Sequence, residues 1–190
     1  MPPIALQNER RTPAIVSPPG PAEAGTRPNC LTGIGPSDRS GPVAGVQAWG
    51  ATGSVDENRH LGAGLSHILE HMLFKGTKTR TTNAIAQSVQ DQGGYINAYT
   101  SFDRTVYWID VPNEGVTSAL DILSDAMMNS TLPADEYVKD QEVIRREFAM
   151  GHDDPDRTVA QLLFKTAYQR HPYRLPVIGD IQVFDQLTQQ

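Results

Sequence analysis

The sequence predicts an α+β fold in which helices pack on a largely antiparallel sheet. Strand-like and helix-like stretches follow one another in the order strand, helices, strand pair, helices, without an internal repeat. One stretch, TVYWIDVP, is rich in β-branched and aromatic residues and has apolar side chains on both faces. With 190 residues, 38% of them hydrophobic and 20% charged, the chain can build one domain with a real core.

The first part of the chain differs from the rest in amino-acid composition and in the absence of a hydrophobic period. Nine of the fourteen prolines precede Val43, and they alternate with Gly, Ser and charged residues without a helical or strand period. We therefore predict that residues 1–42 form a Pro/Gly-rich segment without regular structure, and that the folded domain covers residues 43–190.

Three strands are predicted within that domain. PVAGVQAWGATGS, residues 42–54, is typical of a strand followed by a Gly-Ser turn. YINAYTS, residues 95–101, and TVYWIDVP, residues 105–112, are predicted to pair across a short connection. Because the last of the three is apolar on both faces, we expect it to be the central strand.

The helices are predicted from apolar residues at helical spacing. The first is expected within GAGLSHILEHMLFKG, ending near Gly76, and its apolar stripe consists of Leu65, Ile68, Leu69, Met72 and Leu73. A second helix is expected in TNAIAQSVQDQGG, and others over residues 116–127, 135–150 and 157–169. Pro133 precedes the helix at 135–150, a position near helix starts where proline is favoured.

Composition excludes several classes of function. A net charge of -6 and a pI of about 5.3 argue against nucleic acid and anionic membranes as partners, since these are bound through Lys and Arg clusters. No apolar run approaches the roughly 20 residues of a membrane-spanning helix. The amino terminus has arginines after a short, Pro-broken apolar stretch, unlike a secretory signal, so a cytoplasmic location is favoured over a periplasmic or organellar one.

The same composition limits the chemistry of a metal site. Cys30 is the only cysteine, so the chain forms no internal disulfide and no cluster of thiolates. A metal ion would have to be bound by histidine and carboxylate side chains.

The string HILEH, residues 67–71, is the strongest functional signal. His67 and His71 stand four residues apart, so a helix presents both imidazoles on one face, within reach of one ion. Glu70 shares that face, opposite the apolar stripe. The alternative is a solvated helix face with two surface histidines. An H-x-x-E-H string arises by chance in on the order of one chain in a hundred of this size, which favours the metal site.

A catalytic zinc site needs a third protein ligand, and the helix at 135–150 offers candidates. Helical phase places Asp140 and Glu147 on a flank between Val143 and Ile144, where a carboxylate needs a cation or strong donors. Either a zinc ion or a salt bridge to an arginine would compensate the charge of the Glu147 carboxylate. Helical phase does not distinguish these two possibilities. The opposite side of the helix is predicted to be solvated and carries Lys139, Glu142 and Arg146.

These motifs together resemble a known family. HILEH, the strand in GGYINAYTS and the V-I-x-x-E-x-x-M pattern around Glu147 resemble the inverted-motif zinc peptidases of the pitrilysin, insulin-degrading and mitochondrial-processing type, from about Val43 onward. The resemblance implies one Zn²⁺ per chain, held by His67, His71 and Glu147, with Glu70 as the base that activates water. Asp140 stands where the family usually has a second, supporting Glu.

The resemblance also implies a substrate strand. In the family an extended peptide lies along the strand that corresponds to residues 95–100, so Asn97, Ala98 and Tyr99 are expected to contact substrate through β-augmentation. The alternative is that these three are ordinary sheet residues. The segment HPYRLPVIG, residues 171–179, is similar to a loop of the family and is given no chemical role.

The departures from the family define what the chain is expected to lack. The family's opening strand corresponds to Asn29-Cys30-Leu31 and TGIGPSDRSG, which have little strand character, so the first strand is expected to be missing. The chain ends at Gln190, within the family's first domain, so we expect part of a pitrilysin-type enzyme that needs a second homologous half. The predicted function is a zinc-dependent endopeptidase. The alternative is an incomplete or noncatalytic peptidase-like subunit.

Overall fold

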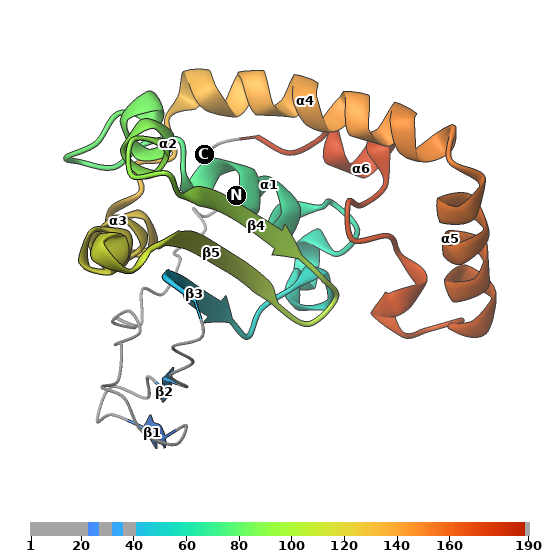
Figure 1. Ribbon diagram of the computed structural model, residues 1–190. Coiled ribbons are helices and arrows are strands. Elements are labelled where there is room, and N and C mark those ends of the chain that lie inside the picture. Colours follow the sequence, from blue (N-terminus) through green and yellow to red (C-terminus); the bar gives the residue numbers. More distant parts are fainter. Residues whose placement is uncertain (1–22, 27–31, 36–40, 189–190) are drawn as a thin grey trace.

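The centre of the computed structural model is a small antiparallel sheet (Figure 1). The structure describes residues 23–26, 32–35 and 41–188. The sheet consists of β3 (Val43–Gly50), β4 (Tyr95–Thr100) and β5 (Thr105–Pro112), in the order β3-β5-β4. Ile109 of β5 is paired with Val46 on one side and with Ile96 on the other. The prediction that residues 105–112 form the central strand is confirmed.

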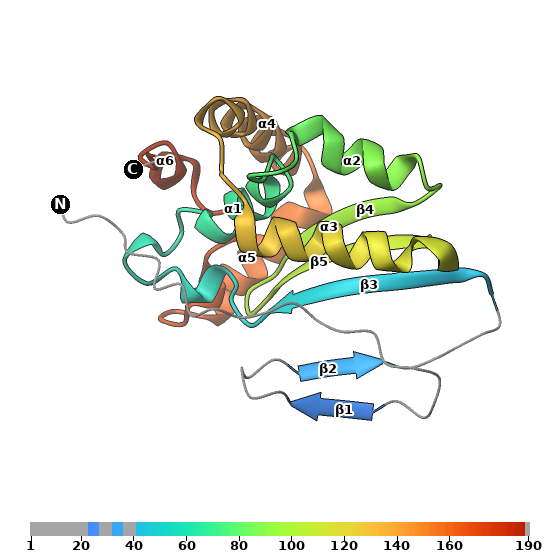
Figure 2. The same cartoon turned by 90° about the vertical axis from the view of Figure 1, so that its left-hand side faces the viewer.

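The first five helices follow the predicted order, with boundaries within a few residues of those expected, and a short sixth helix was not predicted. The helices are α1 (Leu65–Leu73), α2 (Thr82–Gln90), α3 (Val116–Asn129), α4 (Ala134–His152), α5 (Pro155–Ala167) and a short α6 (Ile181–Phe184). Single 3₁₀ turns occupy Ser54–Asp56, Asn58–His60, Asn113–Gly115 and Pro172–Arg174. Figure 2 shows α2 and α3 on one face of the sheet and α1 between the sheet and α4. The fold is α+β, as predicted.

Two apolar clusters hold these layers together. The first joins the inner face of the sheet to α2 and α3, and its members include Val46, Ile109, Val111, Ile85, Val89 and Ile122. The second joins α1, α4 and the carboxyl-terminal segment through Ile68, Met72, Ile144, Ile178 and Phe184. Because α1 and α4 share the second cluster, residues of α4 are brought next to the polar face of α1.

The amino-terminal segment contains regular structure that the sequence did not predict. β1 (Glu23–Thr26) and β2 (Thr32–Gly35) form a two-stranded antiparallel pair. The prediction of no regular structure is wrong for these eight positions, because backbone pairing of short strands requires no apolar alternation. β2 lies where the first strand was expected to be missing, and it pairs with β1. The remainder of residues 1–42, apart from the last two, lies outside the described residues.

None of the helices within the described ranges is long and apolar enough to cross a membrane.

Candidate metal centre

The two histidines project from the side of α1 that faces away from the apolar core. Ile68 and Met72 are each only 2% exposed and anchor the opposite side of the helix. The His67 and His71 rings lie one turn apart, with centroids separated by 4.8 Å and ring planes inclined by 72°. The local helix therefore brings the two imidazoles together, as the i, i+4 spacing predicted.

α4 brings the carboxylate of Glu147 to these imidazoles. Glu147 Oε2 lies 3.5 Å from His67 Nε2, and Glu147 Oε1 lies 3.7 Å from His71 Nε2. One potential ligand atom from each of the three residues falls within 4.8 Å of the others. Within residues 23–26, 32–35 and 41–188, no other group of three or more His, Cys, Asp or Glu side chains is arranged in this way.

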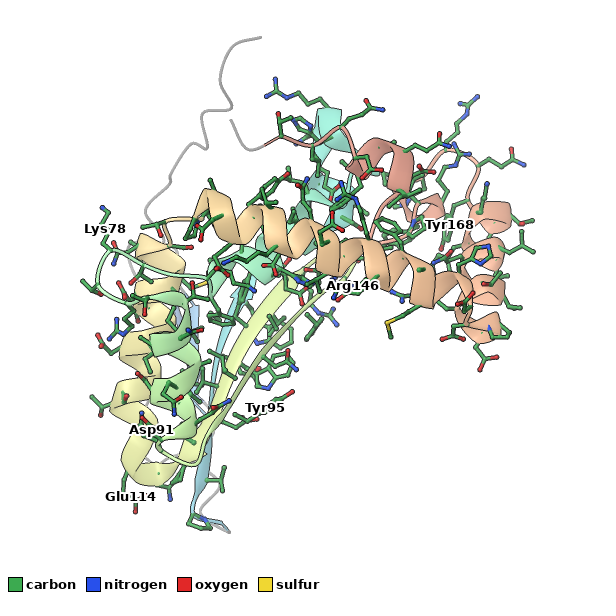
Figure 3. All side chains as sticks on the ribbon, turned by 90° about the horizontal axis from the view of Figure 1, so that it is seen from above. Lys78, Asp91, Tyr95, Glu114, Arg146 and Tyr168 are labelled. Atoms are coloured by element: carbon green, nitrogen blue, oxygen red, sulfur yellow. The ribbon has the colours of Figure 1, made fainter. Side chains whose placement is uncertain are left out.

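The sequence left open whether Glu147 meets an arginine or a metal site. Among the described residues Glu147 forms no salt bridge to arginine, and its ion-pair contacts are with the two histidines. Arg146 is exposed on the other side of α4, as are Lys139 and Glu142, in agreement with the predicted solvated face. Figure 3, seen from above, shows α4 crossing over the strands, with Arg146 near its middle.

The arrangement fits a zinc ion. Two imidazole nitrogens and one carboxylate oxygen form a donor set that zinc accepts while one coordination position stays open. Tetrahedral ligands at about 2.0–2.2 Å from zinc lie roughly 3.3–3.6 Å from one another. Each histidine Nε2 lies 3.5 or 3.7 Å from one of the two Glu147 oxygens, close to this range, and one ligand atom from each of the three residues lies within 4.8 Å of the others.

The protonation state of His67 suits a ligand. Burial, the neighbouring His71 and the positive charge of Arg157 together lower the pKa of His67 to about 4. The imidazole is therefore neutral near physiological pH, and the neutral form is the one that binds a metal.

Glu70 is held in the same turn of α1, with one oxygen free. Burial raises its pKa, and the nearby Glu147 adds to the increase, while Thr100 and His71 oppose it. Glu70 Oε2 is buried and has no hydrogen-bond partner within the described part of the chain. A carboxylate with a raised pKa and a free oxygen is suited to exchanging a proton with a water molecule.

β4 is an edge strand of the described sheet and lies beside α1. Thr100 Oγ1 donates to the Ser66 carbonyl oxygen at 3.4 Å, which ties the strand to the metal helix. Asn97 is exposed, and its Oδ1 accepts from the Ala98 amide at 2.8 Å. Tyr99 is half-buried. Tyr95, labelled in Figure 3, projects from the edge of the sheet.

Asp140 does not lie among the histidines. It is only 3% exposed, and its Oδ1 accepts from Lys75 Nζ at 2.9 Å. The expected supporting carboxylate is thus paired with Lys75, two residues beyond the end of α1.

A cavity of about 500 Å³ is lined in part by Glu147. It lies between the end of α4, α5 and residues 174–181, and Arg157 and Arg174 form part of its wall. This volume falls within the usual range of ligand pockets.

Nothing in the sequence indicated that Glu57 contacts the helix that carries the two histidines. Glu57 lies between two 3₁₀ turns, is 6% exposed, and accepts a hydrogen bond from the Ser66 amide at 2.9 Å. Burial raises its pKa, whereas Ser66 and the amides of Gly64 and Gly62 oppose the increase. The contact spans nine residues of irregular chain, and no periodic pattern signals a contact of this kind.

Comparison with known proteins agrees with this geometry. The family described as Insulinase (Peptidase family M16) matches residues 35–181. The chain is 40% identical to the zinc protease YmxG of Bacillus subtilis over 134 residues, which are 70% of this chain and 32% of that protein. It is 35% identical to the probable mitochondrial-processing peptidase subunit beta of Arabidopsis thaliana over 165 residues, which are 87% of this chain and 31% of that protein.

Among solved structures, a protease from Helicobacter pylori superposes with a TM-score of 0.82 at 29% identity. The match covers 88% of this chain and 41% of that one. The chain spans about a third of the length of the curated relatives it matches. Together with the helix that bears both histidines and the glutamate that faces them, the match over most of its length places this chain in peptidase family M16.

Proposed function

We propose that this chain forms the zinc-binding and water-activating part of a metalloendopeptidase. His67, His71 and Glu147 hold the zinc ion, and Glu70 is the general base. The observation that supports this best is the convergence of one nitrogen from each histidine and one Glu147 oxygen within 4.8 Å. The names of the relatives, zinc protease and processing peptidase, support the same class of activity.

The chemical role of each residue follows from its environment. A zinc ion, when bound, acts as a Lewis acid that activates water and polarises a peptide carbonyl. Glu70 takes a proton from that water at its free Oε2 and delivers it to the leaving amine. The neutral His67 presents a nitrogen lone pair without first losing a proton. Asp140 supports the site indirectly, through the ion pair that joins α4 to Lys75.

The substrate class follows from the edge strand. An extended peptide adds to β4 as a further antiparallel or parallel strand and contacts Asn97, Ala98 and Tyr99. The Ala98 amide donates to the Asn97 side chain in the structure, and a bound peptide carbonyl replaces that acceptor. Main-chain recognition of this kind suits peptides of varied sequence.

A second homologous half contributes to activity. Stabilising the charge that develops in the transition state often contributes most to catalysis. Among the described residues of this chain, we assign no hydrogen-bond donors to the reacting carbonyl oxygen. The second candidate function is therefore a peptidase-like unit that binds zinc but hydrolyses peptides only with a partner half. The chain spans about a third of each relative's length, which supports this second candidate.

Zinc content tests the ligand assignment. Elemental analysis after dialysis is expected to give about one zinc per native chain, as for the catalytic sites of this type. Glu147→Gln should lose the metal, whereas Glu142→Gln, an exposed glutamate on the same helix, should keep it. A folded native chain without zinc, or a Glu147→Gln variant with full zinc content, would remove the basis of the proposal.

A peptide assay tests the base. If the native chain cleaves a quenched fluorescent peptide, Glu70→Gln should abolish cleavage and retain zinc. Turnover that persists in zinc-loaded Glu70→Gln would contradict the role of Glu70. A native chain that binds zinc and cleaves only after addition of a second half supports the second candidate function.

A further inference from the structure

α1 begins without a side-chain cap of its own. The residue before its first turn is Gly64, which has no side chain to accept hydrogen bonds from the free amides of that turn. The helix is nine residues long and carries both histidines and Glu70. Its first turn must therefore be fixed by another part of the chain if His67, its third residue, is to keep its place.

Glu57 supplies the missing acceptor. Its Oε1 accepts a hydrogen bond from the amide of Ser66 at 2.9 Å, one residue before His67. Glu57 is 6% exposed and Ser66 is 8% exposed, so water does not readily replace this bond. Glu57 is itself held by the 3₁₀ turns around it, because its carbonyl oxygen accepts from the His60 amide at 2.8 Å.

The loop between Glu57 and α1 has little freedom to adjust. Gly64 has a φ of +70°, and a Cβ added there would lie 2.1 Å from the Ile178 carbonyl oxygen. The Asp180 amide donates to the Gly62 carbonyl oxygen at 2.8 Å. Ile178 belongs to the apolar cluster shared by α1 and α4. With backbone packed against backbone on this side, a lost Glu57 bond cannot be replaced by a small movement of the loop.

We propose that Glu57 is a positioning residue for the metal centre, which holds the first turn of α1 so that His67 and His71 both meet Glu147. This inference rests on the zinc site proposed above. Without the carboxylate, the Ser66 amide is buried without an acceptor and the first turn of α1 frays. Fraying displaces His67 first, because His67 lies closer to the start of the helix than His71. Partners that orient metal ligands typically change metal affinity by about 10–100-fold when they are removed.

Three substitutions separate the hydrogen bond from general packing. Glu57→Ala removes the acceptor, and Glu57→Asp keeps a carboxylate whose side chain is one methylene too short to reach the Ser66 amide. Glu57→Gln keeps a carbonyl oxygen at the right reach. Asp125→Ala is the control, since Asp125 is also a buried carboxylate, 9% exposed, but its hydrogen-bond donors all lie outside α1.

Zinc affinity is measured by competition with a chelator, the Co²⁺-substituted site by its visible absorption, and stability by thermal unfolding of the metal-free chain. Glu57→Ala and Glu57→Asp are expected to raise the zinc Kd by about 10–100-fold and to change the Co²⁺ spectrum. Glu57→Gln should retain more affinity than Glu57→Ala, because its carbonyl oxygen still accepts from the Ser66 amide, although its NH₂ group cannot accept from the Gly64 and Gly62 amides. Asp125→Ala should lower the melting temperature while its zinc Kd stays close to that of the native chain.

The outcomes distinguish this inference from the proposed function. Native zinc affinity in Glu57→Ala or Glu57→Asp, whatever their melting temperature, overturns the positioning role and leaves the zinc site standing. A Glu57→Gln variant as weak as Glu57→Ala overturns the assigned hydrogen bond. If Glu57→Ala does not fold, Glu57→Asp decides. A native chain that binds no zinc overturns both the positioning role and the proposed function.

Discussion

Lys75 and Asp140 form an ion pair between the segment that follows α1 and the middle of α4, with Lys75 Nζ 2.9 Å from Asp140 Oδ1. Asp140 is seven residues before Glu147, two helical turns away on the same side of α4. The Asp140 side chain is 4% exposed and that of Lys75 is 27% exposed. The pair thus links, near the candidate metal centre, the two helices that carry its ligands.

Breaking this pair from the cation side should destabilise the chain strongly. Lys75→Met leaves the buried Asp140 carboxylate without its partner, and we expect a loss of about 3 kcal/mol in the free energy of unfolding. The double variant Lys75→Met/Asp140→Leu removes both charges and should recover much of that loss. Urea unfolding of the native chain, Lys75→Met, Asp140→Leu and the double variant measures the coupling between the two side chains. A loss in the double variant equal to that in Lys75→Met would contradict the expected recovery.

Two neighbouring residues of α4 should differ in how much each contributes to the free energy of unfolding. Ile144 is fully buried among residues of α1 and α6, whereas the adjacent Val143 is 38% exposed. Ile144→Ala should lower the free energy of unfolding by about 2–5 kcal/mol. Val143→Ala, the control, should change it by about 1 kcal/mol or less. Denaturant unfolding in the presence of a chelator measures both, and similar losses would show that Ile144 does not anchor α4.

Acid should weaken the fold through Asp125. Burial raises the pKa of its carboxyl, but hydrogen bonds from four side chains, Thr77, Asn129, Thr79 and Arg80, outweigh burial and lower the pKa from 3.8 to about 2. Since the folded pKa lies below the unfolded one, the carboxylate stabilises the fold above about pH 4, and this contribution is lost as the pH falls toward about 2.

The measurement is the free energy of unfolding against pH for the metal-free chain. The native protein should lose stability more steeply than Asp125→Asn between about pH 4 and about pH 2. Asp121→Asn is a suitable control, because Asp121 also contacts Arg80 but its side chain is 71% exposed. Parallel curves for native protein and Asp125→Asn would show that Asp125 does not carry the acid sensitivity.

Pairing along β4 should make peptide binding depend on alternate main-chain amides. Successive backbone N–H groups of a strand point to opposite edges, so only every second amide of a bound peptide reaches β4. Methylating those amides singly should weaken binding by about 5–10-fold, the effect of losing roughly 1–1.4 kcal/mol per bond. Methylating the intervening amides should have little effect.

Competition with a fluorescent peptide, on zinc-loaded Glu70→Gln protein, measures these affinities without cleavage. The intervening methylated peptides are the internal control for changes in peptide conformation. An effect that does not alternate along the peptide would argue against strand addition at Asn97 and Ala98.

Much of the fold was determined by local sequence. The pairing of His67 with His71 depends only on helical spacing, and the flanking apolar stripe already places them on the side away from the core. The central position of β5 follows in the same way from apolar residues on both of its faces. These features depend on residues a few positions apart, so periodicity alone identifies them.

Helical phase did not decide which carboxylate meets the histidines; the family resemblance favoured Glu147, and the tertiary structure gives the physical reason. Asp140 and Glu147 share a helical flank, and helical phase cannot distinguish them. Packing of Ile144 in the cluster with Ile68 sets how α4 crosses α1, which places Glu147 at the imidazoles and Asp140 at Lys75.

The same limit explains the other features that the sequence did not reveal. The contact of Glu57 with Ser66 runs through irregular turns, and the pairing of β1 with β2 is made by backbone groups that every residue has. A hydrogen bond between distant segments leaves no period in the sequence, because its geometry is set by the packing of whole elements rather than by the residues between them.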